Sequence, residues 1–149
     1  MRYRIPRPIQ WVHYCHCRMC QKAMGNVFAA LAPAPKSAIV WTRGKPKIFR
    51  SSSAAERGFC AKCGTPLTFA YVDSKNLNVS IGSLDDPGAV APDRHVGTEA
   101  QLPWLRLADD LPKSGTDVAA LKRHFPKFQN HQHPDHDTRA WPPRRRTAP

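Results

Sequence analysis

Five cysteines in two tight groups constrain this chain of 149 residues more than any other feature of its sequence. Cys15, Cys17 and Cys20 form the first group, and Cys60 and Cys63 form the second. Within each group the cysteines are spaced too closely for ordinary disulfides, but their sulfurs can converge on one metal ion from a single turn of backbone. We therefore expect reduced thiols that bind Zn²⁺, with the fold organised around them.

The spacing is compatible with two kinds of zinc site. Three thiolates from the first group would leave a fourth coordination position open for water or substrate, as in a catalytic zinc site. A thiol substrate would bind there as a thiolate, because the metal lowers its pKa. Alternatively, Cys60 and Cys63, followed by Gly64, form half of a zinc knuckle. That half would join two of the first three cysteines around one closed structural ion and leave one cysteine spare.

Histidines flank the first group and add candidates for the site. Residues 9–15 alternate enough to predict a strand, so Cys15 and Cys17 should face the same way and His16 the opposite way. His13 is then better placed than His16 to lie near the metal. The spacing does not choose among the groups that could transfer a proton, which are Asp85, His13 and His95.

The rest of the sequence predicts a mainly β domain of short antiparallel strands. Fifteen prolines limit the helix content. Residues 18–32 predict either a helix or a helical turn followed by a strand. Alternation over 76–81 places Leu77, Val79 and Ile81 on one face of a strand. The other predicted elements are a strand over 66–71 and a β-hairpin formed by 38–42 and 47–50.

Length and charge predict one domain over residues 1–112 and a tail over residues 113–149. The net charge is +12, and the tail carries eight basic and three acidic residues together with four histidines. This composition cannot bury a core, so we expect a poorly ordered tail, solvated in the simplest case but able to bind nucleic acid. No membrane-length apolar run or export signal is present, and this indicates a cytoplasmic protein.

Several motifs occur together in a specific order and spacing. They are Cys15-His16-Cys17-Arg18-Met19-Cys20-Gln21-Lys22-Ala23-Met24-Gly25, Trp41-Thr42-Arg43-Gly44, Arg57-Gly58-Phe59-Cys60-Ala61-Lys62-Cys63-Gly64-Thr65-Pro66-Leu67, Ile81-Gly82-Ser83-Leu84-Asp85-Asp86-Pro87 and Leu102-Pro103-Trp104. Over about residues 9–112 the chain thereby resembles the glutathione-dependent formaldehyde-activating enzyme family, which also includes centromere protein V.

The resemblance implies a tent-like, mainly β fold with two zinc sites. In that family the Cys15, Cys17 and Cys20 positions hold the catalytic-type zinc, and the Cys60 and Cys63 positions belong to the structural one. The named reaction joins glutathione to formaldehyde as S-hydroxymethylglutathione and is classed as carbon-sulfur lyase chemistry. An anionic glutathione-like thiol would suit a basic face, for which the candidate residues are Arg18, Lys22, Arg43, Lys45 and Arg57.

The chain also departs from the family pattern. Members usually carry an upstream Gly-x-Cys-x-Cys-Gly strand that supplies two structural ligands, whereas no cysteine precedes Cys15 here. Either the start codon of this chain was assigned too late, or the chain is a truncated or diverged member of the family whose remaining cysteines share one ion. Half a structural site would forfeit folding energy that the metal provides.

Three functions follow from these patterns. The first is a zinc-dependent enzyme of the carbon-sulfur lyase class that acts on a thiol adduct. The second is a non-catalytic zinc module that binds a partner or nucleic acid through its basic termini. The third is a thiol redox protein that uses Cys60 and Cys63.

Overall fold

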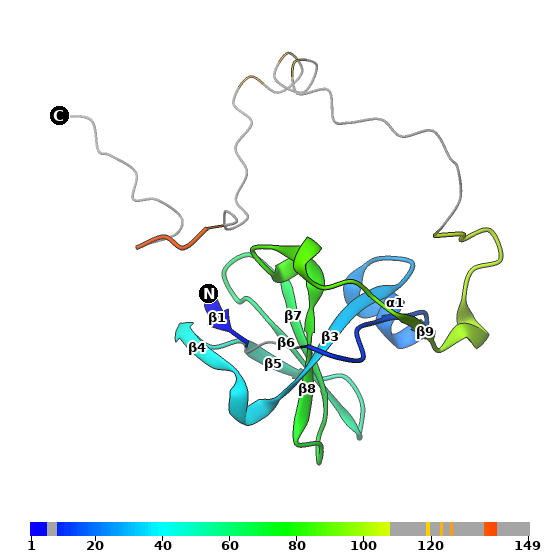
Figure 1. Cartoon of the computed structure of the whole chain (residues 1–149), viewed down its shortest axis with the longest axis horizontal. Helices are drawn as coiled ribbons and strands as arrows, with labels where there is room; N and C mark the ends of the chain where they lie inside the picture. The colour runs from blue at the N-terminus through cyan, green and yellow to red at the C-terminus, as the bar shows by residue number, and fades with distance from the viewer. Residues whose placement is uncertain (6–8, 108–118, 120–122, 124–125, 127–135, 140–149) are drawn as a thin grey trace.

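The computed structural model describes residues 1–5, 9–107, 119, 123, 126 and 136–139 (Figure 1). Most of the predicted tail, over 113–149, lies outside the described residues. Among the described residues, no helix is long and apolar enough to cross a membrane.

The fold is mainly β, as predicted. The strands are β1 (Arg2–Arg4), β2 (His13–Cys15), β3 (Ala29–Pro35), β4 (Val40–Arg43), β5 (Lys47–Arg50), β6 (Ala55–Phe59), β7 (Pro66–Tyr71), β8 (Asn76–Ser80) and β9 (Arg94–Val96). One sheet has the order β5-β6-β7-β8-β3-β2-β9, and β1 pairs with β4 in a second sheet of two strands. The described strands pair antiparallel except for β2 and β9, which are parallel.

Short helical segments connect the strands. Helix α1 (Arg18–Met24) lies between β2 and β3. It ends at Gly25, whose left-handed conformation (φ 58°) lets the chain turn back into a strand. A helical turn followed by a strand is therefore the correct alternative for residues 18–32. The described part of the chain then forms four 3-10 segments: η1 (Lys36–Ala38), η2 (Ile81–Ser83), η3 (Pro87–Ala89) and η4 (Thr98–Ala100).

The predicted hairpin of 38–42 with 47–50 is wrong, although both strands exist. β4 pairs with β1, and β5 pairs with β6, so the two strands belong to different sheets. The connection contains Gly44 in the left-handed region (φ 66°), followed two residues later by Pro46, which has no N–H to donate to a strand ladder. The chain therefore changes sheet at this point instead of folding back on itself.

The core is divided by β3, whose alternate residues are buried on opposite faces. Ala32 and Ala34 lie in the larger cluster, with Val79 and Ile81. Leu77 packs against the same cluster, so the predicted shared face of β8 is confirmed.

On the other face of β3, Ala29 and Leu31 form a smaller cluster with Cys20, and Cys15, Cys17 and Met24 pack against it. The first cysteine group is thus attached to the sheet through β3.

Candidate metal centre

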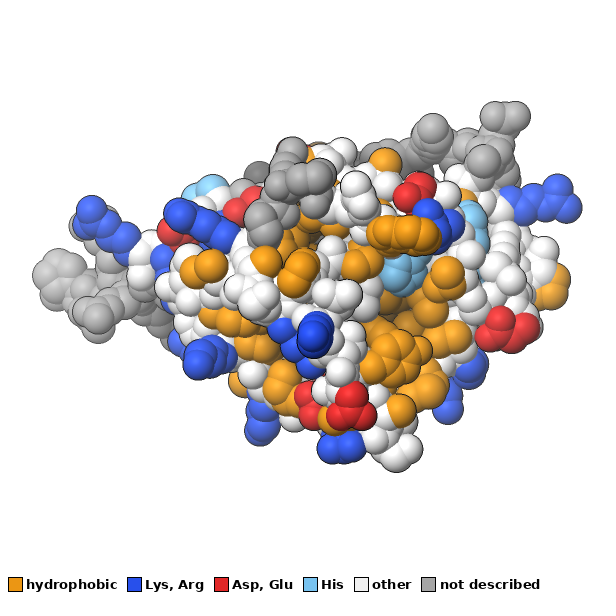
Figure 2. All heavy atoms as spheres, turned by 60° about the horizontal axis from the view of Figure 1, so that its bottom comes forward, with side chains coloured by type: hydrophobic (Ala, Val, Ile, Leu, Met, Phe, Trp, Pro, Cys, Tyr) orange, Lys and Arg blue, Asp and Glu red, His pale blue; other side chains and the backbone are white. Residues whose placement is uncertain are grey.

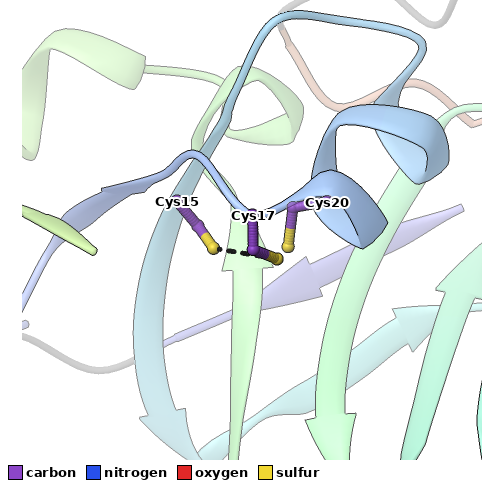
Figure 3. Close-up of side chains that lie close together, drawn as sticks. All are labelled: Cys15, Cys17 and Cys20. Atoms are coloured by element: carbon purple, nitrogen blue, oxygen red, sulfur yellow. Dashed lines mark hydrogen bonds between the residues drawn. The ribbon is translucent and has the colours of Figure 1, made fainter. Parts of the chain in front are cut away.

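The three cysteines of the first group converge in space (Figure 3). Cys15 is the last residue of β2, Cys17 precedes α1, and Cys20 lies in the first turn of that helix. The Cys20 amide donates to the Cys17 carbonyl at 3.0 Å. This first turn of the helix brings the Cys20 thiol close to the Cys17 thiol. The three Sγ atoms all lie within 4.8 Å of one another, and those of Cys15 and Cys17 are 3.5 Å apart.

This arrangement fits zinc. A Zn–S bond of about 2.3 Å in a tetrahedron separates neighbouring sulfurs by about 3.8 Å, close to the spacing of the cluster. Contact with Cys15 and with the Arg57 guanidinium lowers the pKa of Cys20 to about 5. The same contact, together with burial, raises the pKa of Cys15. Adjacent sulfurs resist becoming thiolates together unless a cation compensates them, which is what a bound metal ion provides.

The second group of cysteines forms a separate turn. The Gly64 amide donates to the Cys60 carbonyl at 2.8 Å, and the Cys63 thiol lies 3.0 Å from the Thr65 hydroxyl. Burial alone would raise the pKa of Cys63, but hydrogen bonds from Thr65 and the Cys60 thiol lower it on balance.

Within the described parts of the chain, the sulfurs of Cys60 and Cys63 do not join the cluster formed by the first group. The single four-cysteine ion that spacing also allowed is therefore not the arrangement of this fold.

His16 lies on the opposite side of the strand from the thiols, as predicted. Its side chain is completely buried, stacks on the His95 ring at a centroid distance of 5.0 Å and contacts Phe28. Its Nε2 lies 2.7 Å from His95 Nδ1, whereas its Nδ1 has no hydrogen-bond partner among the described residues. Burial and the neighbouring His95 lower the pKa of His16, which favours the neutral ring.

The three proton-transfer candidates occupy different places. His13 follows the same face of β2 as Cys15, and its Nδ1 lies 2.9 Å from the Trp11 carbonyl oxygen. The Asp85 carboxylate forms an ion pair with Arg2 of β1. His95 contacts His16 through Nδ1. None of the three belongs to the sulfur cluster, which contains only cysteines among the residues described.

Sequence reasoning missed Gln21, which holds the backbone around the cluster. Gln21 is buried, and its Nε2 donates to the carbonyl oxygens of His16 at 2.8 Å and Ala100 at 2.9 Å. One side chain thus ties α1 to the loop between Cys15 and Cys17 and to η4. A glutamine inside a cysteine motif could have signalled this role, because a buried amide needs partners for its two donors.

Sequence reasoning also missed Gly97, which lies against Cys17. It adopts φ +63°, and a Cβ added there would lie 2.8 Å from the Cys17 amide nitrogen. The contact brings together residues that are far apart in sequence, so only the fold reveals it.

Arg57 was predicted as part of a basic face, but it is buried, with 8% of its surface exposed. Its Nη2 lies 3.5 Å from Cys20 Sγ, and its guanidinium lies 4.9 Å from the centre of the Phe69 ring. A divalent ion with three thiolates carries one net negative charge, which this guanidinium would balance.

The other basic residues of the predicted face have different surroundings. Arg18 donates to Gln21, and Arg43 on β4 pairs with Asp137. Lys22 on α1 lines a cavity of about 460 Å³ together with Arg57.

Comparison with known proteins agrees with this centre. Residues 1–100 match the sequence profile of the glutathione-dependent formaldehyde-activating enzyme family. A segment of 62 residues is 40% identical to an uncharacterized lyase of Schizosaccharomyces pombe and covers 42% of this chain and 44% of that protein. The chain thus matches less than half of the length of this relative. Because the family profile covers 100 of the 149 residues and includes both cysteine groups, the chain belongs to the glutathione-dependent formaldehyde-activating enzyme family.

Proposed function

We propose that this protein is a zinc-dependent enzyme of the carbon-sulfur lyase type, acting on the adduct of a small thiol with an aldehyde. The adduct of glutathione with formaldehyde, S-hydroxymethylglutathione, is the first candidate substrate. The observation that carries the proposal is the convergence of three thiols at one point of a chain that belongs to this family, with no fourth protein ligand beside them among the residues that the structure describes.

Cys15, Cys17 and Cys20 would hold the zinc, and their role in catalysis would be to keep it in place with one position open. When bound, zinc in such a site lowers the pKa of a substrate thiol and polarises a carbonyl group. Arg57 would stabilise the Cys20 thiolate, since its guanidinium lies against that sulfur. Gln21 would fix the loop that carries the first two ligands.

Cys60 and Cys63 would take part in a second, structural zinc site. Their turn is closed by backbone hydrogen bonds and keeps the two thiols in contact, as a zinc knuckle requires. Two thiolates are half of a tetrahedral set, so the remaining ligands would come from outside this turn.

Zinc per chain, measured by elemental analysis of the purified protein, tests the assignment of the ligands. Cys20→Ser should lose the zinc of the first group, whereas Cys63→Ser, the matched control, should keep it. In protein loaded with Co²⁺, glutathione should change the thiolate-to-metal absorption of the wild type and of Cys63→Ser, but not of Cys20→Ser.

The reaction itself is followed by NMR, from the exchange of ¹³C-formaldehyde between its hydrate and S-hydroxymethylglutathione. The zinc-loaded wild type should accelerate this exchange above the spontaneous rate, and Cys20→Ser should not. Full zinc retention in Cys20→Ser, with no response of the metal to glutathione, would contradict the proposal.

A further inference from the structure

A cavity of about 460 Å³ lies between α1 and the edge of the large sheet. Met19 and Met24 of α1 line it on one side, and Phe49 of β5, Phe59 of β6 and Pro66 of β7 line it on the other. These walls are apolar. Figure 2 shows one face of the molecule in a space-filling view. Hydrophobic side chains gather there around a hollow, and Lys and Arg side chains lie among and around them.

Two cations interrupt the apolar lining of this cavity. Lys22 is exposed at α1, and Arg57 is more than nine-tenths buried. The Nε and Nη1 atoms of Arg57 are buried and have no hydrogen-bond partner among the described residues. A buried charged donor without a partner is costly, so its presence beside a cavity points to a ligand that supplies the acceptor.

The position of Arg57 links the cavity to the metal centre. Its Nη2 lies 3.5 Å from Cys20 Sγ, so the same side chain borders the cavity and contacts a zinc-ligand candidate. If the charged end of a ligand in the cavity contacts Arg57, only the guanidinium of Arg57 separates it from the sulfur cluster. The burial of Arg57 would strengthen the pairing of charges, because a guanidinium away from water is screened less.

We propose that this cavity binds the carboxylate of the substrate, with Arg57 as the residue that pairs with it and Lys22 as a second cation at its edge. The inference rests on the proposed function, because it assigns the thiol of the same molecule to the open position of the zinc. Arg57 would present its unpaired Nε and Nη1 groups to the carboxylate while Nη2 stays against Cys20. The substrate class is then a small thiol that carries a carboxylate, and neutral thiols bind weakly.

The test compares two probes that share one thiol and one carbon chain length. 3-Mercaptopropionate carries a carboxylate, and 3-mercapto-1-propanol carries a hydroxyl in its place. Their affinities for the full-length, Co²⁺-loaded protein are measured from the change in thiolate-to-metal absorption. The wild type should bind the carboxylate probe about tenfold more tightly or better, since a charge-assisted hydrogen bond replaces a neutral contact.

Three variants test whether Arg57 causes the preference for the carboxylate probe. Arg57→Met should bind both probes equally, and Arg57→Lys should keep part of the preference because it keeps the charge but not the planar fork. Arg50→Met is the matched control: Arg50 lies on β5, is exposed, bonds the Ser53 carbonyl and does not line the cavity. It should retain the wild-type preference.

Equal binding of the two probes by the wild type would overturn the inference, and so would a full preference in Arg57→Met. If Arg57→Met fails to fold, a full preference in Arg57→Lys would overturn it as well.

A third probe separates this inference from the proposed function. Butyrate has a carboxylate but no thiol, and its binding is followed by ligand-observed NMR. Two results together would support the carboxylate site and refute the lyase proposal. The wild type would bind butyrate and Arg57→Met would not, and neither thiol probe would change the absorption of the cobalt-loaded protein. If both thiols alter the cobalt spectrum with equal affinity, the proposed zinc chemistry stands and the carboxylate site is refuted.

Discussion

Gly97 packs closely against the backbone of Cys17 in the first cysteine group. It lies just after β9, with φ +63°, and an added Cβ would lie 2.8 Å from the Cys17 amide nitrogen and 2.9 Å from the Cys17 Cβ. A side chain there must either strain its own backbone or displace a zinc-ligand candidate. Gly97 therefore permits the close packing around Cys17 without offering a side-chain ligand atom of its own.

We expect Gly97→Ala to destabilise the protein and weaken its zinc binding. The left-handed conformation alone costs about 1–2 kcal/mol, and the contact with Cys17 adds to it. Chemical denaturation and competition with a zinc-binding dye would measure the two effects. Gly82→Ala is the control, because a Cβ at Gly82 meets no atom within 4 Å and should change stability by less than about 0.5 kcal/mol. Equal behaviour of the two variants would show that the close contact has no effect.

Gln21 holds the backbone around the first cysteine group through its two donors. In Gln21→Leu the carbonyl oxygens of His16 and Ala100 lose these partners, at a cost of about 1–3 kcal/mol for each one left buried and unpaired. Loss of a group that orients metal ligands typically weakens metal affinity by about 10–100-fold.

Gln21→Glu should be worse than Gln21→Leu, because its carboxylate would face two carbonyl oxygens. The same titrations apply, with Gln101→Leu as the control at a partly buried glutamine that makes one long contact, 3.3 Å from the Leu105 carbonyl. Wild-type zinc affinity in Gln21→Leu would contradict the positioning role.

At the scale of elements, Tyr3 is one of the residues that join the small sheet of β1 and β4 to the rest of the protein. The Tyr3 ring packs on Trp41 at a centroid distance of 5.2 Å, and its hydroxyl lies 2.6 Å from Ser83 Oγ in η2. Burial raises the pKa of Tyr3 above its ordinary value of about 10. The protonated phenol is thus favoured by the folded state.

Tyr3→Phe should cost about 0.5–1.5 kcal/mol at neutral pH, the usual contribution of one such hydrogen bond. Because the folded pKa lies above the unfolded one, the unfolded chain loses its proton first. The contribution is therefore complete below about pH 10 and is lost as the pH rises through the folded pKa. Denaturation from pH 8 to 11 should show the difference between wild type and Tyr3→Phe shrinking with rising pH. A difference that grows instead would reverse the sign of the shift.

Elements with a local signal were predictable from the sequence, and their partners were not. Alternation predicted β8 to within one residue, and the strand predicted over 66–71 has the bounds of β7. The partner of β4 is β1, some 40 residues away, and no local pattern encodes such a pairing.

The candidate site divides in the same way. Three candidate ligands close together in sequence were visible from spacing, but Arg57 and Gly97 reach the cluster only through the fold. Arg57 in particular was expected at the surface, because an arginine is rarely buried without a paired charge.

At the scale of the whole molecule, the domain expected over residues 1–112 meets part of the following segment. Asp137 forms ion pairs with Arg2 and Arg43, and Thr138 accepts a hydrogen bond from Arg43. Asp137 is largely exposed, with 73% of its side chain accessible, and exposed ion pairs contribute about 0–1 kcal/mol. The contacts join the segment to the small sheet without adding to the core.

A chain shortened to residues 1–112 should therefore lose less than about 1 kcal/mol of unfolding free energy and keep its zinc. The comparison uses Asp137→Asn in the full chain as the control, which removes the ion pairs alone. A much larger loss in the shortened chain than in Asp137→Asn would show that the segment after residue 112 belongs to the domain.

Zinc should contribute to the stability of the whole domain, because its ligand candidates are part of the core. Cys20 packs with Ala29 and Leu31 of β3, the strand that also supplies Ala32 and Ala34 to the larger cluster. Disorder at the metal centre would thus reach both faces of β3. A ligand that binds only the folded state stabilises it by about 2.7 kcal/mol at one hundred times its Kd.

We therefore expect a chelator to lower the melting temperature, and added zinc to restore it in a concentration-dependent way. Cys20→Ser should melt near the temperature of the chelated wild type and respond less to added zinc, since the ligand set of the first group is broken. Cys63→Ser separates the two cysteine groups: if zinc stabilises the protein through the first group, this variant retains a chelator-dependent shift. A wild-type melting temperature that is unchanged by chelation under conditions that remove the metal would mean that the packing around β3 holds the three thiols in place without it.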